Sequence, residues 1–345
     1  MSTRYPAPAS LQQEALGGQQ DFIPAWWCRS GHAQTIWASV LRPMPNVPAR
    51  RERWEIPDGD FLDVDHVPAP AGRPIVIVLH GLEGSSDGKP VRGFLQAVHR
   101  RGWRGLGLNF RSCSGEPNRL RRSYHSGETS DLRWIIRRVA AQYPQDSIGG
   151  VGISLGGNVL LKYLGEQQDD VPPAFKAAVA VSSPFDLAVS ARVFERGFLN
   201  RIYMGRLIRS LKRKTLAKLI RYPDLVDPLQ LAAVRTIGEF DEWVTAPVHG
   251  FADAMSYWTA SSCRQFLRSI RRPTLLINGG DDPVVPADGL PRKEIARHPF
   301  LTAAFPATGG HAGFIGGAWP FRPVLWAEER ALTFLESHMR ALQVP

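Results

Sequence analysis

The sequence of 345 residues predicts a mostly parallel, doubly wound α/β sheet with one long helical insertion. Short apolar runs rich in β-branched residues recur along the chain, which is typical of strands buried on both faces. Helical segments separate most of these runs, and this alternation is typical of a doubly wound sheet. One interval between two runs is far too long for an ordinary crossover, so we expect an insertion there.

The N-terminal part of the chain precedes this pattern. Residues 1–20 are polar and rich in Gln, without hydrophobic periodicity, and we expect them to form a disordered tail. Residues 21–50 contain the aromatic stretch Phe22-Ile23-Pro24-Ala25-Trp26-Trp27 and then Gly31-His32-Ala33-Gln34-Thr35-Ile36-Trp37. We expect this segment to pack on the body of the protein, where it either clamps the structure or lines the mouth of a substrate site.

The predicted sheet domain has a first part at residues 51–183 and a second part at residues 273–345. It opens with a β-hairpin, because Asp58-Gly59 supplies a tight turn between two runs with strand character. The expected hairpin strands are residues 52–56 and 60–67. The other expected strands are residues 74–79, 105–110, 148–153, 177–181, 274–277 and 301–305. Helices are expected at residues 91–100, 128–141, 155–164 and 324–342.

The insertion, residues 184–272, is expected to form a helical cap. Leu199, Tyr203, Leu207 and Leu211 recur every four positions, which indicates an amphipathic helix. Residues 192–221 hold ten basic residues and one acid, so this segment carries +9 of the formal net charge of +10. The charges are either solvated on the outside of the cap or attracted to an anionic lipid surface or acidic substrate. No recognition motif supports nucleic-acid binding.

Several other classes of protein are disfavoured. There is no signal-peptide pattern and no run of 18 apolar residues, so we expect a cytoplasmic protein, with peripheral contact with the inner membrane as an open alternative. Cys28, Cys113 and Cys263 are odd in number and widely spaced, which suits reduced thiols. The histidines and carboxylates form no metal-ligand pattern, and no Gly-Lys-Ser/Thr follows the Gly-rich turn at residues 150–156. We therefore expect neither a metal nor another cofactor.

The strongest functional signal is Gly152-Ile153-Ser154-Leu155-Gly156, between an expected strand and an expected helix. Small residues two positions before and after the serine allow a strained strand-to-helix turn that exposes its hydroxyl. The pattern is weak when taken alone, and its place in the strand–helix order gives it weight. We interpret Ser154 as a nucleophile.

Partners for this serine are expected at the carboxyl ends of neighbouring strands, where open α/β sheets carry their sites. Asp281 and Asp282 follow the strand at residues 274–277, and His311 follows the last expected strand. The order Ser154, Asp282, His311 is that of a hydrolase triad, with His311 as base and Asp282 as the residue that orients it. We prefer Asp282 because Pro-Val-Val-Pro follows it, and Asp281 remains the alternative.

The loop His80-Gly81-Leu82-Glu83-Gly84-Ser85-Ser86 follows the first buried strand. Its glycines allow backbone amides to turn toward a developing oxyanion. We predict that the amides of Leu82 and Leu155 form the oxyanion hole.

Together these residues resemble a known family, the α/β-hydrolases of the YheT type, with plant embryogenesis-associated relatives and a mammalian abhydrolase-domain branch. The resemblance runs from about residue 22 to residue 339. It implies an α/β-hydrolase fold, serine-dependent hydrolysis of carboxylic esters, lipid or acylglycerol esters as substrates in some members, no cofactor and often loose membrane association. The motifs that carry it are Gly31-His32-Ala33-Gln34-Thr35, Pro57-Asp58-Gly59-Asp60-Phe61, Leu79-His80-Gly81-Leu82-Glu83-Gly84-Ser85, Asn109-Phe110-Arg111, Tyr124-His125-Ser126-Gly127-Glu128-Thr129, Gly152-Ile153-Ser154-Leu155-Gly156-Gly157-Asn158 and Phe240-Asp241.

Two loops depart from the family pattern. Ser112 follows Asn109-Phe110-Arg111, where the family has Gly, and Asp87-Gly88-Lys89-Pro90 stands where the family more often has an aromatic residue. Both loops are expected to border the pocket, so substrate preference is not carried over from the family. Candidates for lining the pocket are His80, Gly81, Glu83, Arg111 and His125.

We therefore expect a serine carboxylesterase or lipase-like hydrolase that cleaves short- to medium-chain or acylglycerol-type esters through an acyl-enzyme on Ser154. Two alternatives remain open on the same scaffold: a ligand receptor or binding protein with little turnover, and an acyltransferase or thioesterase. The expected partner is a small-molecule or lipid ester, without nucleic acid, and contact of residues 192–221 with an anionic membrane is an open alternative.

Overall fold

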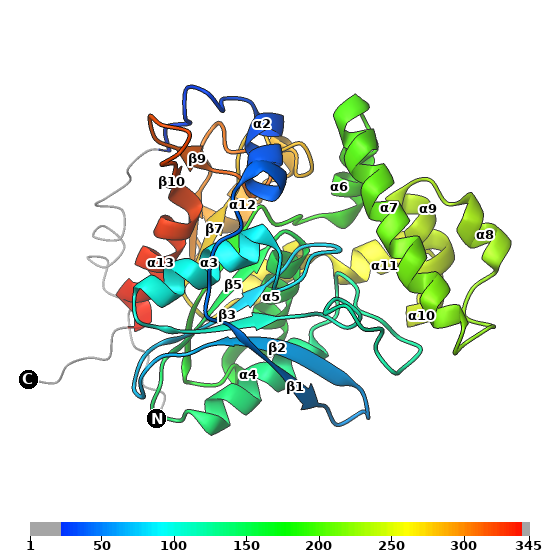
Figure 1. Cartoon of the computed structure of the whole chain (residues 1–345), viewed down its shortest axis with the longest axis horizontal. Coiled ribbons are helices and arrows are strands. Elements are labelled where there is room, and N and C mark those ends of the chain that lie inside the picture. The colour runs from blue at the N-terminus through cyan, green and yellow to red at the C-terminus, as the bar shows by residue number, and fades with distance from the viewer. Residues whose placement is uncertain (1–21, 340–345) are drawn as a thin grey trace, which may run out of the picture.

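The computed structural model describes residues 22–339, and the predicted tail at residues 1–20 lies outside them. An eight-stranded sheet with the order β1-β2-β4-β3-β5-β6-β7-β8 forms its centre (Figure 1). The first two strands pair antiparallel, and β2 also runs antiparallel to β4. All pairs from β4 to β8 are parallel, which confirms the predicted mostly parallel sheet. The strands are β1 (Arg50–Glu55), β2 (Phe61–Val67), β3 (Ile75–Leu79), β4 (Arg104–Leu108), β5 (Ile148–Ile153), β6 (Phe175–Val181), β7 (Thr274–Ile277) and β8 (Leu301–Ala304).

Helices cover both faces of the sheet, so each face has its own hydrophobic core. Side chains of β3 alternate between the two cores: Ile75, Ile77 and Leu79 enter one, and Val76 and Val78 enter the other. The first core is completed by α4 (Ser130–Gln142) and α5 (Leu155–Gln167), and the second by α3 (Lys89–Arg100) and α13 (Trp326–Met339). This arrangement explains the continuous apolar runs in the sequence.

The predicted start of the last helix is wrong. Residues 324–325 were expected to begin the last helix, but Val324 and Leu325 form the short strand β10 (Val324–Leu325), which pairs with β9 (Ile315–Gly316). Backbone pairing with a segment that follows His311 extends these two residues, and α13 begins at Trp326. The predicted end of that helix, at residue 342, lies outside the described residues.

The chain between β6 and β7 is helical, as expected for a cap, and stands beside the sheet domain (Figure 1). The cap has a small hydrophobic core of its own, which includes Phe194, Met204, Ile208 and Phe240. Its elements are α6 (Leu187–Phe194), α7 (Phe198–Leu219), α8 (Pro228–Ala233), α9 (Ile237–Phe240), η3 (Asp241–Thr245), α10 (Ala246–His249), α11 (Ala254–Ser261) and η4 (Cys263–Ser269).

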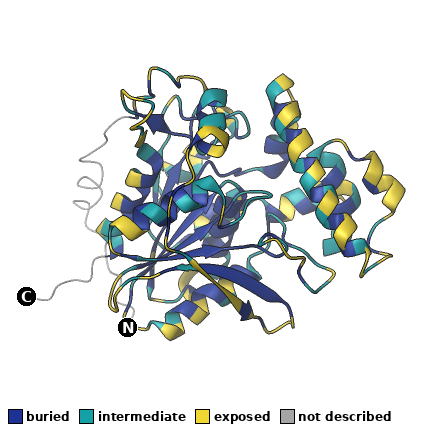
Figure 2. Cartoon of the chain, in the orientation of Figure 1, coloured by how far each residue is buried: buried dark blue, intermediate teal, exposed yellow. Residues whose placement is uncertain are grey.

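The long helix α7 carries apolar side chains on two sides. Met204 and Ile208 pack into the cap core, whereas Tyr203 and Leu207 are only partly buried and line a cavity between cap and sheet domain. The predicted apolar stripe therefore faces mainly toward that cavity. The opposite face of α7 is exposed along much of its length (Figure 2).

Candidate active site

Ser154 lies at a sharp turn between β5 and α5. Its backbone has φ 54° and ψ −120°, a strained combination for a residue with a side chain. The flanking glycines permit close packing: a Cβ at Gly152 would lie 2.4 Å from the carbonyl oxygen of Gly156, and a Cβ at Gly156 would lie 2.6 Å from that of His80. The turn thus requires the small residues that the sequence pattern contains.

The structure brings Ser154, His311 and Asp282 into one line of hydrogen bonds. The Oγ of Ser154 is 2.9 Å from Nε2 of His311. On the other side of the ring, Nδ1 of His311 is 2.9 Å from Oδ2 and 3.1 Å from Oδ1 of Asp282. A proton on Nδ1 that is donated to the carboxylate leaves Nε2 free to accept the serine proton.

The two neighbouring aspartates occupy different positions. Asp282 has a fully buried side chain that faces the imidazole, and its Oδ1 also accepts hydrogen bonds from the amides of Val284, at 2.8 Å, and Val285, at 3.0 Å. Asp281 instead accepts a hydrogen bond from the amide of Gly310 at 2.8 Å. Of the two carboxylates left open by the sequence, Asp282 contacts the ring and Asp281 contacts the backbone of the histidine loop.

The loop after β3 packs directly against the serine. A Cβ at Gly81 would lie 3.1 Å from Cβ of Ser154, and Leu82 and Leu155 both border the cavity that contains the serine. The His80 ring is buried, where Nδ1 donates to the carbonyl of Gly81 at 2.7 Å and Nε2 accepts from the amide of Phe110 at 3.1 Å. Burial lowers the pKa of His80 to about 4, so the ring is neutral near pH 7 and supports the loop.

A cavity of about 510 Å³ extends from Ser154 and His311 between the cap and the sheet domain. Four of the predicted pocket residues line it: His80, Gly81, Glu83 and His125. The N-terminal segment also reaches the wall through α2 (Gly31–Ile36) and η1 (Trp37–Leu41), so it lines the cavity as well as packing on the body. Apolar wall residues from the cap are Leu187, Ala191, Phe194, Leu207, Leu211, Ile237, Phe240, Val244 and Val248.

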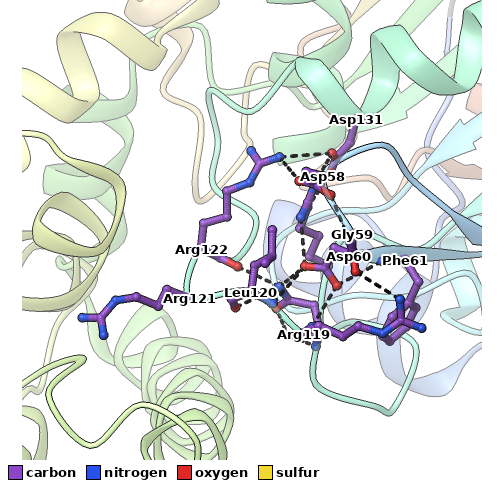
Figure 3. A network of polar contacts seen from close by, with 12 residues as sticks. Asp58, Gly59, Asp60, Phe61, Arg119, Leu120, Arg121, Arg122 and Asp131 are labelled. Atoms are coloured by element: carbon purple, nitrogen blue, oxygen red, sulfur yellow. Dashed lines mark hydrogen bonds and ion pairs between the residues drawn. The ribbon is translucent and has the colours of Figure 1, made fainter.

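The predicted place of Arg111 at the pocket is wrong, because the cavity wall does not include it. Its side chain has no exposed surface and forms ion pairs with Asp58 at 2.8 Å, Asp60 at 2.9 Å and Asp131 at 2.6 Å. Figure 3 shows these three carboxylates together beside the loop at residues 119–122. A buried guanidinium must be paired, and here it joins the hairpin turn to α4.

Two lysines of α7 line the cavity and are drawn away from solvent: Lys218 is buried and Lys214 is half-buried. Lys214 Nζ is 2.9 Å from Oε1 of Glu83, the residue next to Leu82. Lys218 Nζ donates to the carbonyls of three consecutive loop residues at 2.7, 2.8 and 2.9 Å, those of Leu120, Arg121 and Arg122. Burial lowers the pKa of Lys218 to about 7. Because a run of basic residues is usually a solvated surface, nothing in the sequence distinguishes these two lysines.

The inner cavity wall carries three further groups with shifted pKa values, two histidines and one aspartate. The rings of His125 and His249 are 4.5 Å apart between centroids, and burial lowers the pKa of each, to about 4 and about 3 respectively. Both imidazoles are therefore neutral near pH 7. Asp241, in η3, is a buried carboxyl that accepts hydrogen bonds from Trp258 Nε1 at 2.8 Å and Thr245 Oγ1 at 2.7 Å.

Asp241→Asn is expected to stabilise the protein at neutral pH. Burial raises the pKa of Asp241 from 3.8 to about 6, so the folded protein retains the proton to higher pH than the unfolded chain. The contribution of this group to stability is therefore greatest below pH 3.8 and decreases as pH rises through about 6. A pKa that is two units higher in the folded protein corresponds to a loss of about 3 kcal/mol in folding stability above pH 7. The neutral amide of Asn avoids this loss.

The measurement is the free energy of unfolding in urea, compared between the wild type and Asp241→Asn at pH 4 and pH 8. Asp241→Asn should raise the free energy of unfolding at pH 8 and leave it unchanged at pH 4. Asp288→Asn, which removes an exposed carboxylate, is the matched control. A gain of equal size at both pH values would contradict the assignment of the effect to ionisation.

Within residues 22–339, no group of three His, Cys, Asp or Glu side chains is arranged to hold a metal ion. All three cysteines are buried and free. Among the described helices, none has the length and apolar character needed to span a bilayer.

Comparisons with known proteins agree with this fold. Residues 74–315 match the family model described as the alpha/beta hydrolase fold. The chain is 38% identical to the Escherichia coli (strain K12) protein YheT, provisionally named an esterase, over 93% of this chain and 94% of that one. It is 28% identical to embryogenesis-associated protein EMB8 of Picea glauca, covering 88% and 70% of the two chains, and 27% identical to phospholipase ABHD3 of Mus musculus, covering 90% and 77%.

A solved structure, the Pyrococcus furiosus esterase Pf2001, superposes with a TM-score of 0.55 over 85% of this chain and 94% of that one, at 17% sequence identity. At that identity the likeness concerns the fold alone. The sequence relatives go further, because the match to YheT spans nearly the whole of both chains. The chain therefore belongs to the α/β-hydrolase fold family, in the group that includes YheT and its plant and mammalian relatives.

Proposed function

We propose that this protein is a serine hydrolase that cleaves carboxylic esters. The observation that carries the proposal is the hydrogen-bonded line from Ser154 through His311 to Asp282 at the wall of a largely apolar cavity. In the first half-reaction, Nε2 of His311 accepts the serine proton while Oγ attacks the ester carbonyl carbon. The proton then passes to the leaving alcohol, and an acyl-enzyme remains on Ser154.

In the second half-reaction, His311 removes a proton from water, which attacks the acyl carbonyl; the bond from the carbonyl carbon to Oγ then breaks, the acid leaves, and His311 returns the proton to Oγ of Ser154. Each half-reaction develops negative charge on the carbonyl oxygen. We assign the stabilisation of this charge to the amides of Leu82 and Leu155. Both residues line the cavity that contains Ser154, and Leu155 is the first residue of α5, where backbone N–H groups have no partner within the helix. Each such donor contributes about 2.7–4 kcal/mol to stabilisation of the transition state.

The cavity supports esters with short- to medium-length acyl chains or acylglycerol-type substrates. Its volume of about 510 Å³ and the apolar side chains contributed by the cap suit an aliphatic chain. The relative from Mus musculus is named a phospholipase, and phospholipids also carry carboxylic esters. The direct test is sustained hydrolysis of p-nitrophenyl butyrate by the whole chain. A single burst equal to the amount of enzyme, without further turnover, would instead indicate a ligand-binding protein.

We also propose that the exposed face of α7 contacts anionic membranes. Along this face, Arg206, Arg209 and Arg213 lie between exposed apolar side chains at the two ends of the helix, Phe198 and Ile220. The spacing of these residues places them on one side of the helix. A helix surface of basic and apolar residues is suited to the interface of an anionic bilayer.

Neutralising two of these arginines is expected to weaken vesicle binding by about 30-fold, because each basic residue near an anionic surface contributes roughly 1 kcal/mol. The variant is Arg209→Gln with Arg213→Gln, and binding is measured by co-sedimentation with phosphatidylglycerol-containing vesicles at low salt. The matched control is Arg133→Gln with Arg137→Gln, which removes the same charge from the exposed side of α4. Equal binding to purely zwitterionic vesicles, or an equal loss in the control, would rule out this contact.

A further inference from the structure

We propose that Thr35, Ser182 and Asp281 are positioning residues for His311, an inference that rests on the proposed role of this histidine as the base. Three consecutive amides of the histidine loop each donate to one of these side chains. Gly310 donates to Oδ1 of Asp281 at 2.8 Å, and His311 donates to Oγ1 of Thr35 at 2.9 Å. Ala312 donates to Oγ of Ser182 at 2.8 Å.

The three side chains come from three separate parts of the fold. Thr35 lies on α2, Ser182 directly follows β6, and Asp281 follows β7. Asp282, which contacts the imidazole, is the neighbour of Asp281 in the chain. Asp281 therefore holds the backbone of the histidine loop, and the next residue, Asp282, holds the ring of His311. Thr35 and Ser182 hold the backbone of the histidine loop from two other parts of the fold.

The loop requires such support because its backbone is strained. Gly310 has φ 59°, and Ala312 and Phe314 have φ 55° and 53°. The left-handed region costs a residue with a Cβ about 1 kcal/mol or more, so this loop conformation is not one that the local sequence favours. Bonds from outside the loop help to offset this cost: Ser182 accepts the amide of the strained Ala312, and Thr35 and Asp281 accept the amides of the two residues before it.

The contact with α2 is close and specific. The Thr35 hydroxyl donates to the carbonyl of Gly31 at 2.7 Å, which leaves its oxygen lone pairs to accept the His311 amide. A Cβ at Gly31 would lie 2.1 Å from the carbonyl oxygen of Asp281, and a Cβ at Gly310 would lie 2.2 Å from that of Gly31. Gln34, next to Thr35, forms hydrogen bonds with both the amide and the carbonyl of Ile315, at 2.5 and 3.0 Å.

Loss of one of these bonds should affect the chemical step more than substrate binding. The His311 ring must remain 2.9 Å from both Ser154 and Asp282, and displacement of a catalytic group by about 1 Å can cost on the order of 10²-fold in rate. A partial shift should therefore reduce kcat and leave KM nearly unchanged. Ser182 gives the cleaner readout, because Thr35 borders the cavity and Ser182 is absent from its described wall.

The experiment compares Ser182→Ala with Ser183→Ala. Both serines are fully buried, but the amides of Gly310, His311 and Ala312 bond to Asp281, Thr35 and Ser182 and not to Ser183. With p-nitrophenyl butyrate, Ser182→Ala should lower kcat about tenfold with KM within about twofold of wild type, and Ser183→Ala should retain the wild-type kcat. Thermal unfolding confirms that each variant is folded at the assay temperature.

A second pair tests the same inference on α2. Thr35→Val removes the hydroxyl at similar volume and should lower kcat about tenfold, whereas Thr35→Ser keeps the acceptor and should restore the wild-type kcat. Wild-type kcat in both Ser182→Ala and Thr35→Val would overturn the inference, as would equal losses in Ser183→Ala and Thr35→Ser. A separate variant tests the proposed function: it would be wrong if Ser154→Ala kept the activity of the wild type.

Discussion

Ser154→Ala is expected to lower kcat for p-nitrophenyl butyrate by about 10⁴-fold or more, because no other group replaces the attacking Oγ. The substitution removes one atom from a residue whose backbone is fixed by its glycine neighbours. A Cβ is retained, so the strained turn at Ser154 and the start of α5 should persist. The variant should therefore unfold at nearly the wild-type temperature and bind substrate without turning it over.

The measurement is steady-state release of p-nitrophenol, with active-site labelling by a fluorophosphonate as an independent readout. Ser183→Ala is a suitable control, because it makes the same chemical change at a buried serine away from the triad. A rate for Ser154→Ala within tenfold of wild type would show that hydrolysis does not pass through this residue. Loss of labelling without loss of turnover would lead to the same conclusion.

Asp282→Asn is expected to lower kcat by about 10⁴-fold, the effect that this change produces in a serine protease triad. The Asn oxygen can still accept the amides of Val284 and Val285, which places the amide nitrogen against the imidazole. That nitrogen is a donor, so Nδ1 of His311 becomes the acceptor and Nε2 carries the proton. In this tautomer His311 cannot accept a proton from Ser154.

Asp281→Asn is the matched control for this prediction. Its side-chain oxygen can still accept the amide of Gly310, so kcat should remain within about tenfold of wild type. The two variants carry the same chemical change at adjacent positions of the chain. Equal rates for Asp281→Asn and Asp282→Asn would contradict the assignment of Asp282 as the residue that orients the base.

The order of strands and helices could be predicted because it depends on local patterns. Buried parallel strands require continuous apolar runs, and the turn at Ser154 requires glycines at fixed offsets, so both features are visible in a few residues. His311 could be proposed for the same reason, since catalytic groups of such sheets follow strand ends. The exception is the strand Val324–Leu325, whose extended form depends on pairing with a separate segment.

Arg111 shows where local patterns give too little information. Its place in a family motif suggested a pocket residue, but Asp58, Asp60 and Asp131 surround it in the interior. The hairpin-turn carboxylates lie more than 50 positions from Arg111 in the chain, at 53 for Asp58 and 51 for Asp60. The sign of each charge is evident from the sequence, whereas its pairing depends on how the hairpin and α4 meet.

The sequence was sufficient for the fold class and for the helical cap between β6 and β7, and it was sufficient to propose Ser154, Asp282 and His311 as a triad, because each of these inferences follows from short-range spacing and strand order. The three-dimensional arrangement was needed for the burial of Lys218, for the ion pair of Lys214 with Glu83, for the cavity beneath the cap and for the contact of Thr35 with His311. That contact joins residues 276 positions apart. Such pairings result from packing of the whole chain, which no local pattern of residue types specifies.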